Sequence, residues 1–377
     1  MERKATRRYA AALAAIVTTT AGLLAGSGLA AGSASAQGFG AFVGPLHHTS
    51  TIASTVPGNG DLNPYGVAVI PRSTGGEFRG NILVSNFNDK GNVQGTGTTI
   101  VEVTPSGKTW VFAQLGRHLN GCPGGVGFTT ALTVLRSGWV IVGSVPTRKG
   151  RISGSGCLIV LDRNGSVRET FTAPDINGPW DMASLDLGGE AVLFVTNVLN
   201  GTVAANGKTV DEGTVIRLNV TIPPFGLPFI SFNTVIGSGF PETLNSAALV
   251  IGPTGAGLGA NGVLYVADTL NNRIAGIPDA VFRGSDDGPG FTVSQGHHLN
   301  GELGLVIAPN GDILTVNGGN GNLVEVTPSG AQIAVSRLDS SGSPPGAGAL
   351  FGLAVVPGRD AVYFVDDATN QLDLLHA

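Results

Sequence analysis

Residues able to bind a metal or to transfer a proton recur along this chain two positions before an asparagine. They are Asp61, His118, Asp175 and His298, which precede Asn63, Asn120, Asn177 and Asn300, and a further copy places Thr243 before Asn245. Because positions i and i+2 of an extended chain point the same way, each such residue should face the same side as its asparagine. Carboxylates, imidazoles and amides that converge in this way predict a metal site or a general acid/base site.

The asparagines of this blade-start motif also have a simpler explanation. Asn bonds its own backbone and tolerates turn geometry, so asparagines at equivalent positions are what one repeated structural bond would produce. The ligand-binding candidates are therefore Asn63, Asn120, Asn177, Asn245 and Asn300, with Trp180 beside the third of them. Trp180 could form the floor of a pocket or pack beneath the turn, and the sequence leaves both roles open.

The spacing of the motif predicts a repeat protein. Successive asparagines lie 57, 57, 68 and 55 residues apart, which indicates stacked copies of one supersecondary unit. Each copy contains a strong apolar strand that ends in valine, and there are six: Ile82–Val84, Val140–Val142, Leu193–Val195, Leu264–Val266, Leu314–Val316 and Tyr363–Val365. Four antiparallel strands in each of six copies predict an all-β fold, a six-bladed β-propeller.

The last copy is incomplete, because only one strand, Gln371–Leu375, follows Tyr363–Val365. A lone strand at His47–Ser54 precedes the first copy and can supply the missing outer strand. We therefore expect the N-terminal strand to join the last blade and close the ring, which removes an exposed sheet edge.

Two segments carry a family resemblance. Leu264–Ile274 resembles the signature of NHL repeats, and Asn63–Val69 resembles the start of such a repeat. NHL propellers include scaffolds, RNA binders and amidating lyases, and similar six-bladed folds include gluconolactonases. The resemblance thus implies a fold more than an activity.

The loops between the second and third strands are long in the first three copies, at Asn86–Thr99, Val145–Gly156 and Asn197–Gly213. In a four-stranded blade they share a face with the blade-start motif, and long loops are commonly functional. Cys122 and Cys157 fall on this face of the second blade. They are either a disulfide that ties down the second long loop or two unrelated thiols.

The N-terminus has the features of an export signal. Arg3, Lys4, Arg7 and Arg8 precede an apolar stretch, which ends near the small residues Ala34–Ala36. We expect cleavage after residue 36, with a secreted propeller of residues 37–377 and no membrane contact; a retained anchor is the alternative. The mature chain would hold 17 Lys and Arg against 25 Asp and Glu, which argues against nucleic-acid binding.

Two functions remain in competition. The first is a monomeric binding module that holds a small molecule or a protein on the face with the long loops, since no nucleophile motif is present. The second is a metal-dependent hydrolase, lactonase or lyase at the channel mouth. Gluconolactonases hold their metal with two acids and an asparagine, and Asn177–Trp180 resembles a lactonase motif that begins with Glu.

Geometry limits the metal hypothesis. His118 and His298 belong to opposite blades, so both could reach one zinc ion only across a narrow channel. Oxygen ligands from Asp61 and Asp175 would suit calcium or another divalent metal better.

Overall fold

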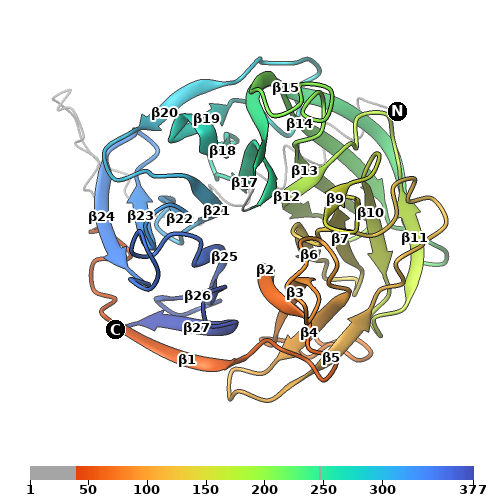
Figure 1. The fold of residues 1–377 in the computed structure, drawn as a ribbon, viewed down its shortest axis with the longest axis horizontal. Helices are drawn as coiled ribbons and strands as arrows, with labels where there is room; N and C mark the ends of the chain where they lie inside the picture. The colour runs from red at the N-terminus through yellow and green to blue at the C-terminus, as the bar shows by residue number, and fades with distance from the viewer. Residues whose placement is uncertain (1–39, 246–247) are drawn as a thin grey trace, which may run out of the picture.

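The computed structural model describes residues 40–245 and 248–377, which form six antiparallel sheets arranged as blades around a central axis (Figure 1). The expected all-β, six-bladed propeller is therefore confirmed. The expected signal, residues 1–36, lies outside the described residues. Among those described, no helix is long and apolar enough to cross a membrane.

The first three blades follow the chain in order. Blade one contains β2 (Leu62–Val69), β3 (Ile82–Asn88), β4 (Thr99–Val103) and β5 (Thr109–Gln114). Blade two contains β6 (Leu132–Val134), β7 (Val140–Ser144), β10 (Cys157–Leu161) and β11 (Val167–Phe171), with a small hairpin of β8 (Thr147–Arg148) and β9 (Arg151–Ile152) in its long loop. Blade three contains β12 (Pro179–Asp186), β13 (Glu190–Asn197), β14 (Val210–Thr221) and β15 (Phe229–Asn245), and β16 (Leu249–Ile251) pairs with the end of β15.

The last three blades are shorter. Blade four contains β17 (Pro253–Leu258), β18 (Leu264–Asp268), the 3-10 turn η2 (Thr269–Asn271), β19 (Arg273–Ile277) and β20 (Phe291–Gln295). Blade five contains β21 (Glu302–Ile307), β22 (Ile313–Asn317), β23 (Asn322–Val326) and β24 (Gln332–Arg337). Blade six contains β25 (Leu350–Val355), β26 (Ala361–Asp366), β27 (Gln371–His376) and the N-terminal strand β1 (His48–Ser54).

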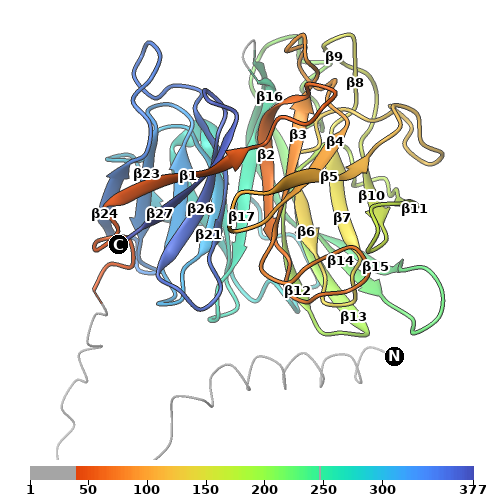
Figure 2. The same cartoon turned by 90° about the horizontal axis from the view of Figure 1, so that it is seen from below.

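Strand β1 closes the ring. It pairs antiparallel with β27, from His48 opposite His376 to Ser54 opposite Gln371, so that the two ends of the chain share one sheet (Figures 1 and 2). The predicted closure is confirmed. Strand β27 therefore pairs with β26 on one side and with β1 on the other, so its backbone groups are not left unpaired at a sheet edge.

The hydrophobic core lies between neighbouring blades. Leu83 and Ile100 of blade one, for example, belong to the same buried cluster as Val142 and Ile159 of blade two. A blade therefore buries its faces only when both neighbours are present, which is the reason a propeller closes on itself.

The long loops and the disulfide lie where the sequence predicts them. Figure 2 shows β8, β9 and β16 together at one edge of the ring, on the face where β2 begins. Cys122 and Cys157 are joined by a disulfide, so the start of β10 is tied to the segment that leads into blade two. The alternative of two unrelated thiols is excluded.

The innermost strands approach one another very closely. The pairing of inner strand with second strand is interrupted at the same point in five blades, for example between Pro64 and Val67 and between Leu350 and Leu353. A glycine lies in this interruption in blades one, four, five and six, and Asp181 takes its place in blade three. A Cβ atom added at Gly352 would overlap the carbonyl oxygen of Tyr65 in the next blade. A Cβ at Gly304 would meet the carbonyl oxygen of Phe351 in the same way.

Gly352→Ala should therefore destabilise the ring at its closure. We expect the free energy of unfolding to fall by about 1–3 kcal/mol, because the inner strands of two blades must move apart. Guanidinium denaturation provides the measurement. Gly189→Ala is the matched control, since a Cβ there would meet no atom within 4 Å. Equal stability of the two variants would contradict the close packing.

Candidate functional site

A cavity of about 540 Å³ opens on the face that carries the blade-start motifs. We call it the mouth cavity. Its walls combine inner-strand side chains with loop residues from blades one, three, five and six, and include Asn92 and Gln94 of the first long loop and Ala347 and Gly348 of the connection between β24 and β25. The predicted face therefore does contain a cavity large enough for a small organic molecule.

Five aromatic side chains form the floor of the mouth cavity: Tyr65, Phe87, Phe128, Trp180 and Phe351. Their ring centroids lie 5.0 Å apart for Phe87 and Phe128 and 5.9 Å apart for Tyr65 and Trp180. The indole Nε1–H of Trp180 donates a hydrogen bond of 2.8 Å to the hydroxyl of Tyr65. Every buried polar atom of this pair thus has a partner, which lets the floor stay rigid.

The floor separates the mouth cavity from a second cavity of about 510 Å³ between the inner strands, because Tyr65 lines both. Asp181 lines this channel cavity. Burial raises the pKa of the Asp181 carboxyl to about 8, so the group is largely protonated at neutral pH. Burial, followed by the nearby charge of Asp181, raises the pKa of Tyr65 well above its usual value.

Asp367 is the carboxylate in the wall of the mouth cavity. Its Oδ2 accepts a 2.9 Å hydrogen bond from the side-chain amide of Asn63, while Oδ1 is buried without a hydrogen-bond partner among the described residues. Burial, and then the charge of Asp366, raises the pKa of Asp367 to about 7, against the lowering effect of Asn63. Near neutral pH this carboxyl can therefore accept a hydrogen bond, pair with a cation or exchange a proton.

Three of the six ligand-binding candidates line the mouth cavity: Asn63, Trp180 and Asn245. Asn120, Asn177 and Asn300 do not belong to its lining. The backbone N–H of Asn177 donates to Asn197 Oδ1, and that of Asn300 donates to Asn317 Oδ1, both at 3.2 Å. This repeated bond uses the backbone of the blade-start asparagine, so it accounts for Asn197 and Asn317 at the ends of the second strands. The side chain of Asn177 donates separately to Asn200 Oδ1 at 2.7 Å.

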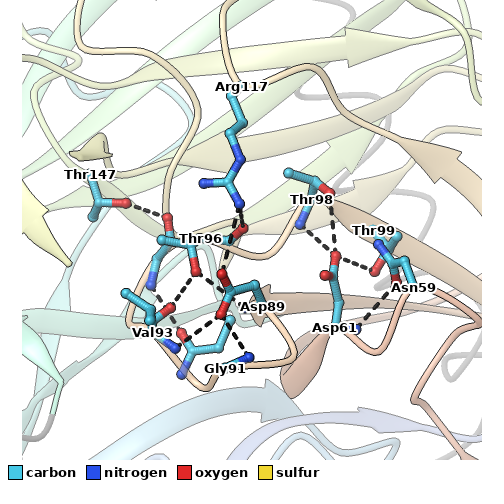
Figure 3. Close-up of polar contacts among 12 residues, drawn as sticks. Asn59, Asp61, Asp89, Gly91, Val93, Thr96, Thr98, Thr99, Arg117 and Thr147 are labelled. Atoms are coloured by element: carbon cyan, nitrogen blue, oxygen red, sulfur yellow. Dashed lines mark hydrogen bonds and ion pairs between the residues drawn. The ribbon is translucent and has the colours of Figure 1, made fainter. Parts of the chain in front are cut away.

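Asp61 is directed toward the first long loop (Figure 3). Its Oδ2 accepts hydrogen bonds from the backbone N–H of Thr98 at 2.8 Å and from the hydroxyl of Thr99 at 2.9 Å. The side chains of Asp61 and Asn63 do not point the same way, because Asn63 has a φ of 61°. This left-handed conformation interrupts the alternation of an extended strand. Asp61 thus anchors the end of the loop.

The other three proposed metal ligands are also outside the mouth cavity. His118 and His298 are exposed, and Asp175 accepts a 2.8 Å hydrogen bond from the side-chain amide of Asn233. Within residues 40–245 and 248–377, no three His, Cys, Asp or Glu side chains gather in a way that could hold a metal ion. The structure does not bring the four candidates together, and metal binding by any of them stays a prediction.

Trp180 is predicted from the sequence, but its partners in the floor and Asp367 are not. Tyr65, Trp180 and Phe351 occupy the same position, directly before the small or polar residue at the pairing interruption of their inner strands. That repeated aromatic position is a signal the sequence does contain. Asp367 comes directly after the polar residue that ends the second strand, the position of Asp366, Asn197 and Asn317, and nothing local distinguishes it.

Neither protein-family models nor curated proteins match this sequence. Solved structures do. Regucalcin, a calcium-binding protein from Agrobacterium tumefaciens, is similar with a TM-score of 0.54 and 15% identity over 88% of this chain and 94% of that one. A gluconolactonase from Xanthomonas campestris has a TM-score of 0.53 and 13% identity over 84% of this chain and 87% of that one. At such identities the likeness concerns the fold, and the expected similarity to gluconolactonase-like propellers is confirmed.

Asp367→Asn should remove one component of the pH dependence of stability. Because the pKa of Asp367 is raised to about 7, its folded state binds the proton more tightly than the unfolded chain does. Its stabilising contribution is complete below about pH 4 and is lost as the pH rises to about 7. The measurement is the free energy of unfolding of the wild type and of the variant at several pH values. The wild-type value minus the variant value should fall by on the order of 1–3 kcal/mol between about pH 4 and pH 7. A difference independent of pH would contradict the assignment.

Proposed function

We propose that this protein binds a small molecule in the mouth cavity. One observation carries the proposal: five aromatic side chains and the partly buried carboxyl of Asp367 line the same cavity. Small-molecule sites are mostly apolar pockets of about 300–1,000 Å³ with few, well-placed polar groups, and the mouth cavity agrees in both respects.

The lining indicates the chemistry of the ligand. The faces of Tyr65, Trp180 and Phe351 favour a flat apolar or aromatic group. The carboxyl of Asp367 in the wall favours a ligand with a hydrogen-bond donor, and an ionised carboxylate prefers a charged donor. An aromatic amine or a heterocycle with an ammonium group satisfies both parts of the site, and its charge would hold Asp367 ionised.

The loop residues account for selectivity. Asn92 and Gln94 supply amide groups from the first long loop, and Ala347 and Gly348 add a smooth wall from the opposite side. A cavity enclosed in this way suits a small molecule better than the flat surface of a protein partner. We therefore place the small-molecule form of the binding hypothesis ahead of the protein form, with the protein acting as a monomer.

The donor set of the mouth cavity fits a metal-dependent hydrolase or lactonase poorly. Asp367 is the one carboxylate in its described lining, and the remaining oxygen donors are amides, a threonine and a phenol. Calcium takes six to eight oxygen ligands and is usually held by several carboxylates. We derive no catalytic step through a metal at this position.

We also propose that the protein is exported, with residues 1–36 removed and residues 37–377 retained. The basic and apolar pattern of the N-terminus supports this compartment. The disulfide between Cys122 and Cys157 supports it independently, since such bonds persist mainly in oxidising environments.

Ligand binding can be tested with a panel of small aromatic amines and matched aromatic carboxylates, followed by ligand-observed NMR. The amines should bind and the carboxylates should not. Ala347→Trp should block binding because Ala347 lines the cavity and is exposed, whereas Ala204→Trp, exposed on the third long loop outside the lining, should retain it. Asp367→Asn should weaken amine binding. Binding that survives both Ala347→Trp and Asp367→Asn would place the ligand elsewhere.

Export predicts a defined N-terminus. The full-length protein expressed in a secreting bacterial host should be recovered outside the cytoplasm, and its intact mass should correspond to a chain that begins at Gln37. Replacing the small residues Ala34 and Ala36 by leucine should block processing. A recovered protein that begins at Met1 would argue for a retained anchor instead.

A further inference from the structure

Two buried glutamates lie on the face opposite the mouth cavity, where blade one meets blade two. Glu102 belongs to β4, and Glu77 lies in the connection between β2 and β3. Both are almost completely buried, with 0% and 1% of their surface exposed. The backbone N–H of Phe78, the residue after Glu77, donates to Glu102 Oε1 at 3.3 Å, which places Glu102 beside the segment that carries Glu77. Burial, and then the charge of Glu102, raises the pKa of Glu77 to about 7. We call the two glutamates the carboxylate pair.

Three of the four carboxylate oxygens in this pair have no hydrogen-bond partner in the described part of the chain. They are both side-chain oxygens of Glu77 and Oε2 of Glu102. The fourth, Glu102 Oε1, accepts hydrogen bonds from the side-chain amide of Asn81 at 2.7 Å and from the backbone N–H of Phe78 at 3.3 Å. Leaving three buried carboxylate oxygens without a positive group or a donor is strongly unfavourable.

An internal repeat supplies the comparison. Val101–Gly107 and Val324–Gly330 have the same sequence, so Glu325 of blade five is the counterpart of Glu102. Both oxygens of Glu325 are satisfied. Oε1 accepts from the backbone N–H of Phe42 at 2.7 Å and from Asn310, and Oε2 accepts from the backbone N–H of Val43 at 2.8 Å. A second carboxylate is close in both blades, Asp312 beside Glu325 and Glu77 beside Glu102, but among the residues described only Glu325 has donors to both of its oxygens.

The loop that carries Glu77 is fixed in place by blade two. The backbone N–H of Gly76 donates to the carbonyl oxygen of Arg163 at 3.0 Å, and Thr74 and Glu77 are paired by two backbone hydrogen bonds. Asp162 and Arg163 are the other charged groups that act on Glu77. Arg163 is exposed, and no ion pair joins it to Glu77 in the residues the structure covers. Among the described residues, no ion pair with a basic side chain therefore neutralises either glutamate.

We propose that Glu77 and Glu102 bind a hard divalent cation, Ca²⁺, between blades one and two. The donors are all oxygen, which excludes soft thiolate-binding metals and favours Ca²⁺ or Mg²⁺. Two carboxylates, which can each bind through both oxygens, leave room for water or backbone carbonyls to complete the coordination. The ion fixes the connection between β2 and β3 to the sheet of blade one, as the amides of Phe42 and Val43 fix the chain at Glu325.

Thermal unfolding of the full-length protein tests the proposal. Millimolar Ca²⁺ should raise the melting temperature above that in EGTA, because a ligand that binds only the folded state stabilises it. Glu77→Gln and Glu102→Gln should each abolish the Ca²⁺-dependent rise. Glu169→Gln, a change at an exposed glutamate of β11, should preserve it. A wild-type melting temperature that ignores Ca²⁺ and Mg²⁺, or a rise that persists in Glu77→Gln, overturns the proposal.

Terbium provides a direct measurement of location. Trp110 pairs with Glu102 across β4 and β5, and its ring packs against Phe78 with centroids 6.4 Å apart. Tb³⁺ bound at the carboxylate pair should therefore show emission sensitised by Trp110, which Ca²⁺ should displace. Trp110→Phe should reduce the emission while the Ca²⁺-dependent melting shift remains, and Glu77→Gln should remove both. Emission that neither substitution changes would place the ion elsewhere and contradict the assignment.

Discussion

The close contact between neighbouring inner strands is the constraint on which the rest of this structure depends. Gly66, Gly255, Gly304 and Gly352 lie where the backbone of the next blade leaves no space for a Cβ atom. At the same interruption in strand pairing, the residue before the glycine is carried to the mouth of the channel in blades one, five and six, as Tyr65, Leu303 and Phe351. The packing that closes the ring therefore also builds the floor of the cavity.

Blade three departs from this pattern, because a carboxyl group takes the place of the glycine beside the channel cavity. Asp181 stands at the position that glycine occupies in blades one, four, five and six. Its carboxyl lines the channel cavity, and burial keeps it largely protonated at neutral pH. Trp180, directly before Asp181, belongs to the aromatic floor, and its indole N–H donates a hydrogen bond to the hydroxyl of Tyr65. One variant blade thus supplies both a polar group below the floor and the largest ring within it.

Buried carboxylates on the two faces of the propeller have different hydrogen-bond partners. On the mouth side, Asp367 lines the cavity and accepts a hydrogen bond from Asn63, while its Oδ1 is buried without a partner among the described residues. On the opposite side, Glu325 accepts backbone N–H groups from the N-terminal segment, whereas Glu102 accepts from Phe78 and Asn81 of its own blade. An identical seven-residue sequence thus has two environments, because the segment that packs against each copy differs.

The structure decided the pairing of Cys122 with Cys157, for which the sequence left two alternatives open. The sequence by itself determined the architecture: six blades, closure by the N-terminal strand and the long loops of blades one to three. These features follow from spacing, apolar patterning and chain order, which are local or periodic properties. Only the tertiary structure decided which polar groups meet. Asp367 reaches Asn63 from 304 positions away, because ring closure places the last blade against the first. Asp61 turns from the channel toward Thr98 because the left-handed backbone at Asn63 breaks the alternation of the strand, a conformation that the repeat pattern does not encode.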